Sequence, residues 1–485
     1  MLHKGVCLTI LLLAAACGGD DPGAPRPLSR GLRIISGADV TDSARARLTT
    51  PLIVEVHDSS GALVPPGTLV RFEVLQDTGG AGVAPLTSNA YSSVATGMTD
   101  GTGRTGALVW LGRYAGPLRL AISAPTQGVA DTVQYIVTPA SLAGIDAFPR
   151  DTALYIGRTY TLQARARDQY GNARPDAITW SIERQGAAVN GAGVVSATVV
   201  GRYQVRVSAA AVSDTTRFSA LPPGILAAFD VNENEVVTIE LDGSNRRVRT
   251  TAMNGGIGVR PRWLAGSDDI VYSTYNGVIQ ELRVVNSAGA SVPFLPSPPS
   301  TMSHQADAAP SPDGSTVFFA AHDSRCSNEE YCLFRSSPDG SAIELLGNDA
   351  NPSAISFRPS SSPDARQVAF TTIENGAAVV KVLDLTSRTV LPWTISGAFP
   401  QWSPAGGRIA FRDETGAVSL INSDGTGVQE LITGPGYYSA GSMGWSPDGL
   451  YIVANSFTGF QLVIVASGES LPLPYLNALG DASWK

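Results

Sequence analysis

A turn motif that recurs through the C-terminal half of the chain constrains its fold most strongly. Trp-Ser-Pro-Asp-Gly stands at 445–449, with looser copies at 402–406 and 311–314, and an apolar run follows each copy. Pro, Asp and Gly suit successive positions of a tight turn. The motif tryptophans and Trp484 are spaced by about 40 residues, the period of a four-stranded propeller blade. The motif therefore predicts a structural joint of a β-propeller, with Trp445 filling the space between blades.

The two ends of this region predict how the ring closes. Its start, ILAAFD at 225–230, is typical of the second strand of a blade, whereas its end, GDASWK at 480–485, is a lone Trp strand. We expect the last strand to complete the first blade, because an open ring would leave strand edges exposed. Five further units then give six blades. Their aligned positions are Trp263, Pro310, Ser361, Trp402 and Trp445.

The Ser-Pro-Asp-Gly copies at 311–314 and 446–449, and Ser-Pro-Ala-Gly at 403–406, resemble the repeat of the periplasmic TolB propeller family. This resemblance covers about 223–485. It implies a six-bladed propeller that binds partner proteins and has no intrinsic catalysis. The α/β domain that precedes the propeller in TolB has no counterpart here, so the resemblance implies no role in the Tol system.

The preceding region alternates apolar and polar residues in short runs separated by Gly or Asp turns, which predicts two β-sandwiches at 31–139 and 140–222. The turn-then-strand TDGTGRTGALV at 99–109 resembles invasin-type bacterial immunoglobulin-like domains. ITWS at 178–181 and GVVSA at 193–197 resemble the bacterial immunoglobulin-like family more closely. The fold class expected is all-β, with two immunoglobulin-like sandwiches that act as spacers before the propeller.

The N-terminus predicts export and anchoring. Residues 1–16 have Lys4 and a short apolar core, as in a secretory signal peptide. Ala-Ala-Ala before Cys17 resembles the lipobox of bacterial lipoproteins, in which the cysteine is lipidated, and residues 17–30 form a flexible tether. Gly18 after Cys17 resembles lipoproteins sent to the outer membrane. An ordinary cleaved signal is the alternative.

Two cysteines remain in the body of the chain, Cys326 and Cys332. In an exported protein this spacing predicts a disulfide across a hairpin loop. A zinc site would need more ligands, and His322 does not complete one. The sequence indicates no metal and no cofactor.

Motifs with catalytic or ligand-binding chemistry have structural explanations. GTGRTG at 101–106 fits a dinucleotide fingerprint, but a strand-like run follows it, so a glycine turn is expected. DVNENE at 230–235 begins like a calcium loop, yet position six is Glu235 and position twelve is Leu241, which favours a hairpin turn. Gly-x-Ser-x-Gly is missing, and His304 and His322 are expected in separate loops of one blade. No catalytic residue is predicted.

Function is expected at the channel mouth. The formal charge of −8, without a basic run, opposes nucleic-acid binding. The interpretation is a monomeric, membrane-anchored lipoprotein facing the periplasm or cell surface, which binds a protein or an envelope polymer. One alternative is a propeller enzyme that hydrolyses or eliminates glycans (a glycan hydrolase or lyase), which clustered carboxylates in the channel would favour. The other is a purely structural envelope protein. The candidate binding ring consists of Arg260, Arg262, His304, Asp307, Gln401 and Asp481.

Overall fold

The computed structural model describes eight stretches of the chain. They are 31–251, 259–275, 278–326, 331–346, 356–432, 443–456, 459–477 and 479–485. Among these residues the regular structure is β-strand apart from two short 3-10 turns, η1 (Pro125–Gln127) and η3 (Pro474–Leu476), which confirms the all-β prediction. No helix within them has the length and apolar character needed to cross a membrane. Cys17, the signal peptide and the tether lie outside the described residues, so they stay predictions.

The chain divides into two compact units, and each is described by itself. The described part of the first contains 31–149, 162–181 and 206–216, and that of the second contains 150–161, 182–205 and the described residues from 217 onward. Both units therefore take strands from the predicted second sandwich, 140–222.

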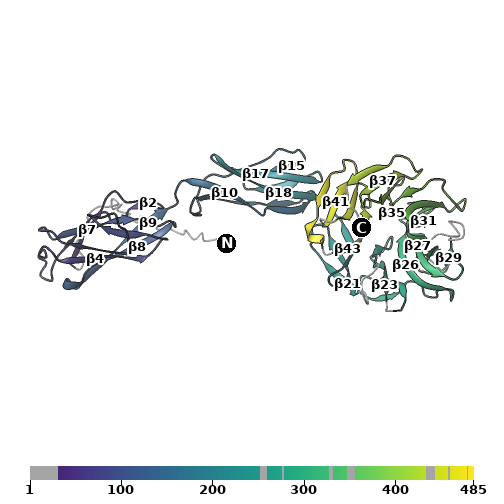
Figure 1. The fold of residues 1–485 in the computed structure, drawn as a ribbon, viewed down its shortest axis with the longest axis horizontal. Coiled ribbons are helices and arrows are strands. Elements are labelled where there is room, and N and C mark those ends of the chain that lie inside the picture. The colour runs from purple at the N-terminus through teal and green to yellow at the C-terminus, as the bar shows by residue number, and fades with distance from the viewer. Residues whose placement is uncertain are drawn as a thin grey trace, which may run out of the picture. The chain divides into compact units, whose positions relative to one another are not determined.

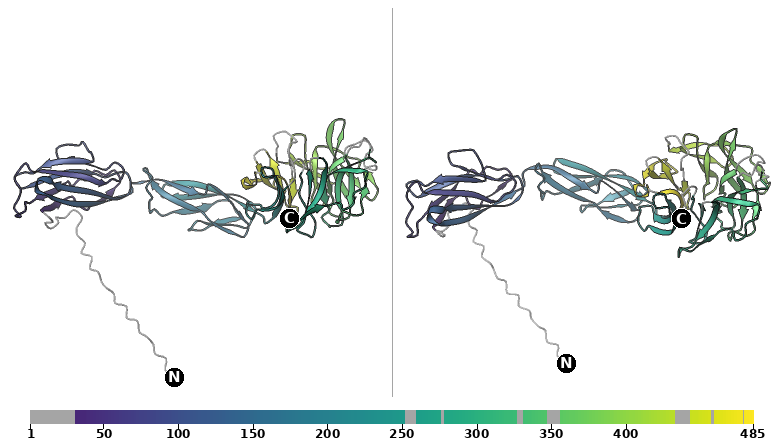
Figure 2. Two further views of the ribbon diagram at one scale, coloured as in Figure 1. Left: turned by 90° about the horizontal axis from the view of Figure 1, so that it is seen from below. Right: turned by 60° about the horizontal axis from the view of Figure 1, so that its bottom comes forward.

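The first region is a sandwich of two sheets (Figure 2). One sheet has the order β1 (Leu32–Ser36), β3 (Leu52–Val56), β7 (Arg104–Trp110), β5 (Gly82–Pro85). The other has the order β2 (Thr41–Ser43), β9 (Val129–Thr138), β8 (Gly116–Ala124), β4 (Leu69–Gln76), β6 (Val94–Met98). Apolar residues of both sheets form one core, because alternate residues of a strand point to the same face.

The glycine-rich motif at 101–106 is a turn that enters a strand, as predicted. Asp100 Oδ1 accepts hydrogen bonds from the main-chain N–H groups of Thr102 and Arg104 at 2.8 and 3.1 Å. Gly103 has a φ of 67°, which a residue without Cβ adopts readily. Strand β7 begins at Arg104, so no helix N-terminus is available here for a pyrophosphate.

The second region contains three sheets. They are β10 (Leu142–Phe148) with β13 (Gln163–Asp168), then β11 (Asp151–Tyr155), β18 (Val212–Leu221), β17 (Gly201–Ala209) and β14 (Thr179–Ile182), and lastly β12 (Thr159–Thr161), β16 (Val194–Ala197) and β15 (Ala187–Val189). An Asp-x-x-Gly turn follows β13 at 168–171, with a main-chain hydrogen bond of 3.1 Å from Gly171 N–H to Asp168 O. Asp168 Oδ1 accepts from the main-chain N–H groups of Tyr170 and Asn172 at 2.8 and 2.9 Å.

Six consecutive sheets follow, arranged around a common centre as a β-propeller (Figure 1). Blade 1 consists of β43 (Leu479–Trp484), β19 (Ile225–Asp230), β20 (Glu235–Glu240) and β21 (Arg247–Thr251). Blade 2 consists of β22 (Arg262–Trp263), β23 (Ile270–Tyr275), β24 (Gln280–Val285) and β25 (Ser291–Pro293). Blade 3 consists of β26 (Met302–Pro310), β27 (Val317–Asp323), β28 (Tyr331–Ser336) and β29 (Glu344–Leu345).

The remaining blades repeat this pattern. Blade 4 consists of β30 (Ser356–Ser361), β31 (Gln367–Glu374), β32 (Ala377–Asp384), β33 (Thr389–Val390) and β34 (Ile395–Ser396). Blade 5 consists of β35 (Ala398–Trp402), β36 (Arg408–Arg412), β37 (Val418–Asn422) and β38 (Gln429–Ile432). Blade 6 consists of β39 (Met443–Trp445), β40 (Tyr451–Ser456), β41 (Gly459–Ile464) and β42 (Ser470–Pro472).

The predicted ring closure is confirmed by strand pairing. The C-terminal strand β43 runs antiparallel to β19, with Leu226 opposite Trp484. Ile225 and Lys485 exchange two main-chain hydrogen bonds of 3.0 and 2.9 Å. The first blade thus combines the two ends of the propeller region, and β43 pairs with the edge that β19 would otherwise expose.

The predicted disulfide is also confirmed. Cys326 follows β27 and Cys332 lies in β28, so the bond clips this hairpin of blade 3, with an S–S distance of 2.01 Å. Both cysteines are buried and belong to the apolar cluster between blades 2 and 3.

Candidate binding site in the propeller channel

The Trp-Ser-Pro-Asp-Gly motif is a tight turn between the first two strands of its blade. The main-chain N–H of Gly449 donates to Ser446 O at 2.9 Å, and Gly449 has a φ of 70°. Ser446 Oγ donates to Asp448 Oδ1 at 2.6 Å and accepts from the Tyr451 N–H at 2.9 Å. The serine and aspartate therefore satisfy polar groups of the turn itself, which leaves the proline ring at the surface.

The motif tryptophans lie between neighbouring blades, as predicted. Trp445 of blade 6 belongs to the same apolar cluster as residues of blade 5, and its Nε1–H donates to Gln401 O of blade 5 at 2.9 Å. Trp263 of blade 2 donates in the same way to Ser483 O of blade 1 at 3.1 Å. These two contacts hold the inner strands of blades 6 and 2 against those of blades 5 and 1.

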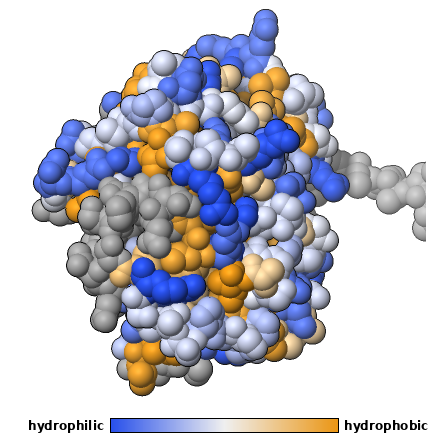
Figure 3. Space-filling model, turned by 90° about the vertical axis from the view of Figure 1, so that its right-hand side faces the viewer, coloured by the Kyte–Doolittle hydropathy of each residue, from blue (hydrophilic) through white to orange (hydrophobic). Residues whose placement is uncertain are grey.

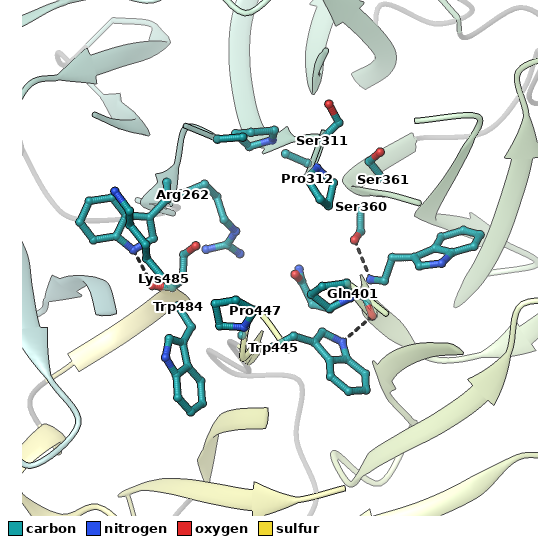
Figure 4. A pocket seen from close by; sticks show the side chains of 18 of the residues that line it. Arg262, Ser311, Pro312, Ser360, Ser361, Gln401, Trp445, Pro447, Trp484 and Lys485 are labelled. Carbon is teal, nitrogen blue, oxygen red and sulfur yellow. Dashed lines mark hydrogen bonds between the residues drawn. The ribbon is translucent and has the colours of Figure 1, made fainter. Parts of the chain in front are cut away.

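A cavity of about 400 Å³ opens where the six inner strands end (Figure 4). Arg262, Gln401 and Pro447 lie around its opening. Turn prolines of several blades contribute to its wall, together with the edges of the motif tryptophans. These residues are Pro312, Pro404, Pro447, Trp263, Trp402, Trp445 and Trp484. The turns between the first two strands of several blades thus also form the wall of this cavity.

A charged cluster lies in a narrower part of the channel. Asp307 Oδ1 is 2.5 Å from Arg260 Nη1, while the carboxylate of Asp481 is 3.4 Å from Arg260 Nε and 2.7 Å from Arg262 Nη1. The four side chains are only 12–15% exposed. Ion pairs of this kind are screened less by water and salt than pairs on an open surface.

A third arginine, Arg358, completes the cluster. Its guanidinium carbon lies 3.4 Å from the ring centre of Phe399, and its main-chain N–H donates to Asp307 Oδ2 at 3.2 Å. Burial and the positive charge of Arg260 lower the pKa of Arg358 to about 9. The side chain therefore still carries its charge at neutral pH, in a setting that disfavours that charge.

The charged cluster and the wide cavity are adjacent. A space of about 20 Å³ lies within the cluster, and four residues line both this space and the wide cavity. These residues are Arg262, Pro359, Gln401 and Met443. A group bound in the wide cavity is therefore next to the arginines.

Five of the six residues of the predicted ring come together, and one does not. Arg260, Arg262, Asp307, Gln401 and Asp481 line the charged space. His304 lines neither cavity, and its ring lies 5.2 Å from that of His322. The prediction that these two histidines occupy separate loops is wrong, because they lie on the paired strands β26 and β27. Register shifts in β26 explain why counting residues along the strand misplaced His304.

Arg358 and Phe399 were not among the predicted site residues, although the repeat contains a signal for them. The residue three places before the end of the inner strand is Arg260, Asp307, Arg358, Phe399 and Asp481 in blades 2, 3, 4, 5 and 1. All five line the charged space. Comparing this one position across the repeats finds the cluster directly.

The calcium-like stretch at 230–235 forms a hairpin between β19 and β20, as expected. Arg246 Nη2 lies 2.8 Å from both Asp230 Oδ2 and Glu235 Oε2, so a cation of the protein itself lies between these carboxylates. Among the described residues, no group of three His, Cys, Asp or Glu is placed to hold a metal ion.

The side of the molecule drawn in Figure 3 offers a weaker candidate than the channel. Figure 3 shows one side of the molecule, where hydrophobic residues occur in several small groups among hydrophilic ones. Small scattered groups of this kind are usual on soluble domains and do not mark a docking site.

Comparison with known proteins gives only distant similarities. No family model matches the sequence, and no curated protein matches it. Among solved structures, the chain is similar to TolB from Acinetobacter baumannii, with 15% identity, 63% of this chain and 82% of that chain covered, and a TM-score of 0.42. It is also similar to a chain of a nidogen/laminin complex, with 9% identity, 54% and 98% covered, and a TM-score of 0.41. The strand pairing within six successive sheets defines the propeller.

Proposed function

We propose that this protein is an envelope lipoprotein whose propeller binds a segment of a partner protein in the channel, at the end that carries the Trp-Ser-Pro turns. The observation that carries the proposal is the cavity of about 400 Å³ beside buried, charged side chains. Ligand sites are typically concave, of about 300–1,000 Å³, with apolar walls and a few placed polar groups. The proline and tryptophan wall and the arginine–aspartate floor have this composition.

The charges of the channel favour binding over glycan cleavage. Glycosidases use two carboxyl groups placed on either side of the bond that they break. Here the carboxylates of Asp307 and Asp481 are each paired with arginine. This mixed arrangement supports a binding floor, so the enzyme is the weaker candidate.

The remaining parts of the proposal concern how the propeller is held. Two sandwiches of the bacterial immunoglobulin-like type serve as spacers, and lipid on Cys17 anchors the chain in the outer membrane. Support for the spacers comes from the motifs at 99–109 and 178–197 and from the strand-rich structure of both regions. Support for the anchor comes from the sequence before Cys17.

Photo-crosslinking in the native organism tests the binding site. Benzoylphenylalanine replaces Pro447 or Ala265, two exposed residues on different blades of the cavity rim, and Tyr475 serves as an exposed control on η3. We expect the same partner protein to be captured from both rim positions and not from the control. Equal capture from the control, or capture of a polysaccharide in place of a protein, contradicts the proposal.

A further inference from the structure

One position of the repeat has an unusual backbone in three successive blades. Asp307, Arg358 and Phe399 have φ values of 56°, 57° and 59°, in the left-handed region that residues with a Cβ seldom adopt. The pairing of each inner strand with its neighbour shifts register at this place. The chain thus forms a bulge at the same place in each of these blades, and all three residues line the channel.

Left-handed conformations of this kind carry a cost that the fold must offset, of about 1–3 kcal/mol for each residue. Strain of this kind clusters at sites that bind ligands. Glycine would avoid the cost at each position, yet the sequence has an acid, a base and an aromatic residue there. The side chains at this position therefore have a purpose beyond closing the ring.

The charges at the floor of the channel do not balance. Three arginines and two aspartates line the narrow space, which leaves one positive charge in excess among the described lining residues. Both aspartates already form ion pairs with Arg260 or Arg262. Within the described residues, the buried Nε of Arg358 has no hydrogen-bond partner. A buried guanidinium with an unsatisfied N–H is costly, and an anionic ligand that accepts from it would reduce that cost.

The wall of the wide cavity indicates which kind of molecule brings the anion. Ser311 Oγ is engaged with Asp313 at 2.6 Å and with the Thr316 N–H at 3.0 Å. Ser360 Oγ accepts a hydrogen bond of 2.8 Å from the main-chain N–H of Trp402. With these hydroxyls engaged, the wall consists of proline rings and indole edges together with the polar side chains of Arg262, Gln401 and Lys485. Proline rings and indole edges suit the apolar side chains of a peptide, and the polar side chains suit its amide groups.

We infer that the channel recognises a carboxylate of a peptide segment, with Arg358 as its main charged contact and the proline wall holding the neighbouring residues. This inference rests on the proposed function and specifies the chemistry of its partner. The carboxylate has two possible sources, an acidic side chain or the C-terminus of the partner chain. The guanidinium of arginine pairs with either one through two parallel hydrogen bonds.

Two hexapeptide pools distinguish the sources. Both are randomised at every position; one has free C-terminal carboxylates and the other is amidated. The full-length protein is incubated with each pool, and bound peptides are identified by mass spectrometry. An acidic side chain as ligand predicts that Asp and Glu are enriched over Asn and Gln in the amidated pool. A C-terminal carboxylate predicts binding from the free pool alone.

Variants connect the preference to Arg358. Arg358→Met is expected to weaken binding of selected peptides by about 10- to 100-fold, the effect of one charge-assisted hydrogen bond. Arg358→Lys keeps the charge but not the planar fork and should recover only part of the loss. Arg408→Met, at an exposed position on β36, is the matched control and should bind as the unchanged protein does. Circular dichroism shows whether each variant is folded.

The outcomes separate this inference from the proposed function. Peptides that bind without any preference for a carboxylate overturn the inference and leave protein binding in place. Binding of tetragalacturonate, an acidic glycan, with no peptide bound overturns the peptide assignment. Failure of the unchanged protein to bind either probe also overturns the inference, whereas the cellular crosslinks test the proposed function independently.

Discussion

Two tryptophans of the repeat provide a matched test of how the blades are joined. Trp402 and Trp445 end the inner strands of blades 5 and 6 and are 6% and 7% exposed. Trp445 Nε1–H donates to Gln401 O at 2.9 Å, but the buried Nε1 of Trp402 has no partner among the described residues. Substitution by phenylalanine removes the same atoms at both places. Only at position 445 does it also remove a hydrogen bond between blades.

These contacts determine how much each substitution lowers the free energy of unfolding. Loss of part of a buried ring costs about 1–3 kcal/mol at either position. Trp445→Phe also leaves the Gln401 carbonyl without its donor, which costs about 1–3 kcal/mol more. Trp402→Phe instead removes a buried donor that has no hydrogen-bond partner among the described residues, which offsets part of the stability lost with the ring. We therefore expect the free energy of unfolding to fall by at least about 1 kcal/mol more in Trp445→Phe than in Trp402→Phe.

Scanning calorimetry of the full-length variants measures this difference. For a domain of this size, each kcal/mol shifts the melting temperature by about 2–4 °C. The propeller transition of Trp445→Phe should therefore lie several degrees below that of Trp402→Phe, whereas transitions of the N-terminal region stay unchanged. Equal shifts, or a larger shift for Trp402→Phe, refute the role assigned to the hydrogen bond.

Three further predictions concern the channel, the ring closure and a contact of blade 6. Burial lowers the pKa of Arg358 to about 9, so above that pH the unfolded state binds more protons than the folded state does. The contribution of Arg358 to the free energy of unfolding should therefore rise as the pH increases through 9. Urea midpoints should show this rise in the unchanged protein and not in Arg358→Met. Gly224→Ala places a Cβ 1.8 Å from Trp484 Nε1, so we expect calorimetry to show a loss of at least about 2 kcal/mol from displacement of the closing strand. Glu469 accepts two hydrogen bonds from Arg184, at 2.6 and 2.7 Å, which lower the pKa of its carboxyl group. Glu469→Gln should cost about 1 kcal/mol at pH 7, and the difference between the two proteins in urea unfolding should vanish as the pH falls below the ordinary range of the glutamate.

Each of these predictions has a control or a contradicting result. A rise of the Arg358→Met midpoint above pH 9 equal to that of the unchanged protein would assign the effect to other groups. Gly191→Ala is the control for the ring closure, because a Cβ there meets nothing within 4 Å. Equal stability of the two alanine variants contradicts the closure argument. A constant difference between Glu469→Gln and the unchanged protein from pH 3 to 7 excludes the charge as its cause.

The fold was predictable because its signals are local. The turn at 446–449 depends on the conformations that its own residues favour, and the spacing of the tryptophans fixes the length of a blade. Ring closure followed from counting strands at the two ends of the repeat region. None of these steps needed knowledge of which distant side chains meet.

The channel floor was predictable only in part. Arg260, Asp307 and Asp481 could be found because they lie near the ends of inner strands. The bulge that sets the direction of Arg358 could not, because a left-handed residue in a strand has no sequence signature when the residue is not glycine. His304 was misplaced for the same reason, because the register shifts of β26 have no sequence signature either.

Hydrogen exchange of the propeller with and without its captured partner tests the central claim most directly. If the partner binds at the Trp-Ser-Pro end of the channel, protection from exchange should increase in the peptides that carry the cavity wall. These peptides span 262–266, 309–312, 359–361, 401–404, 443–447 and 482–485. The outer strands β21, β25 and β42 should exchange as before. Protection confined to those outer strands or to the N-terminal sandwich would contradict the account.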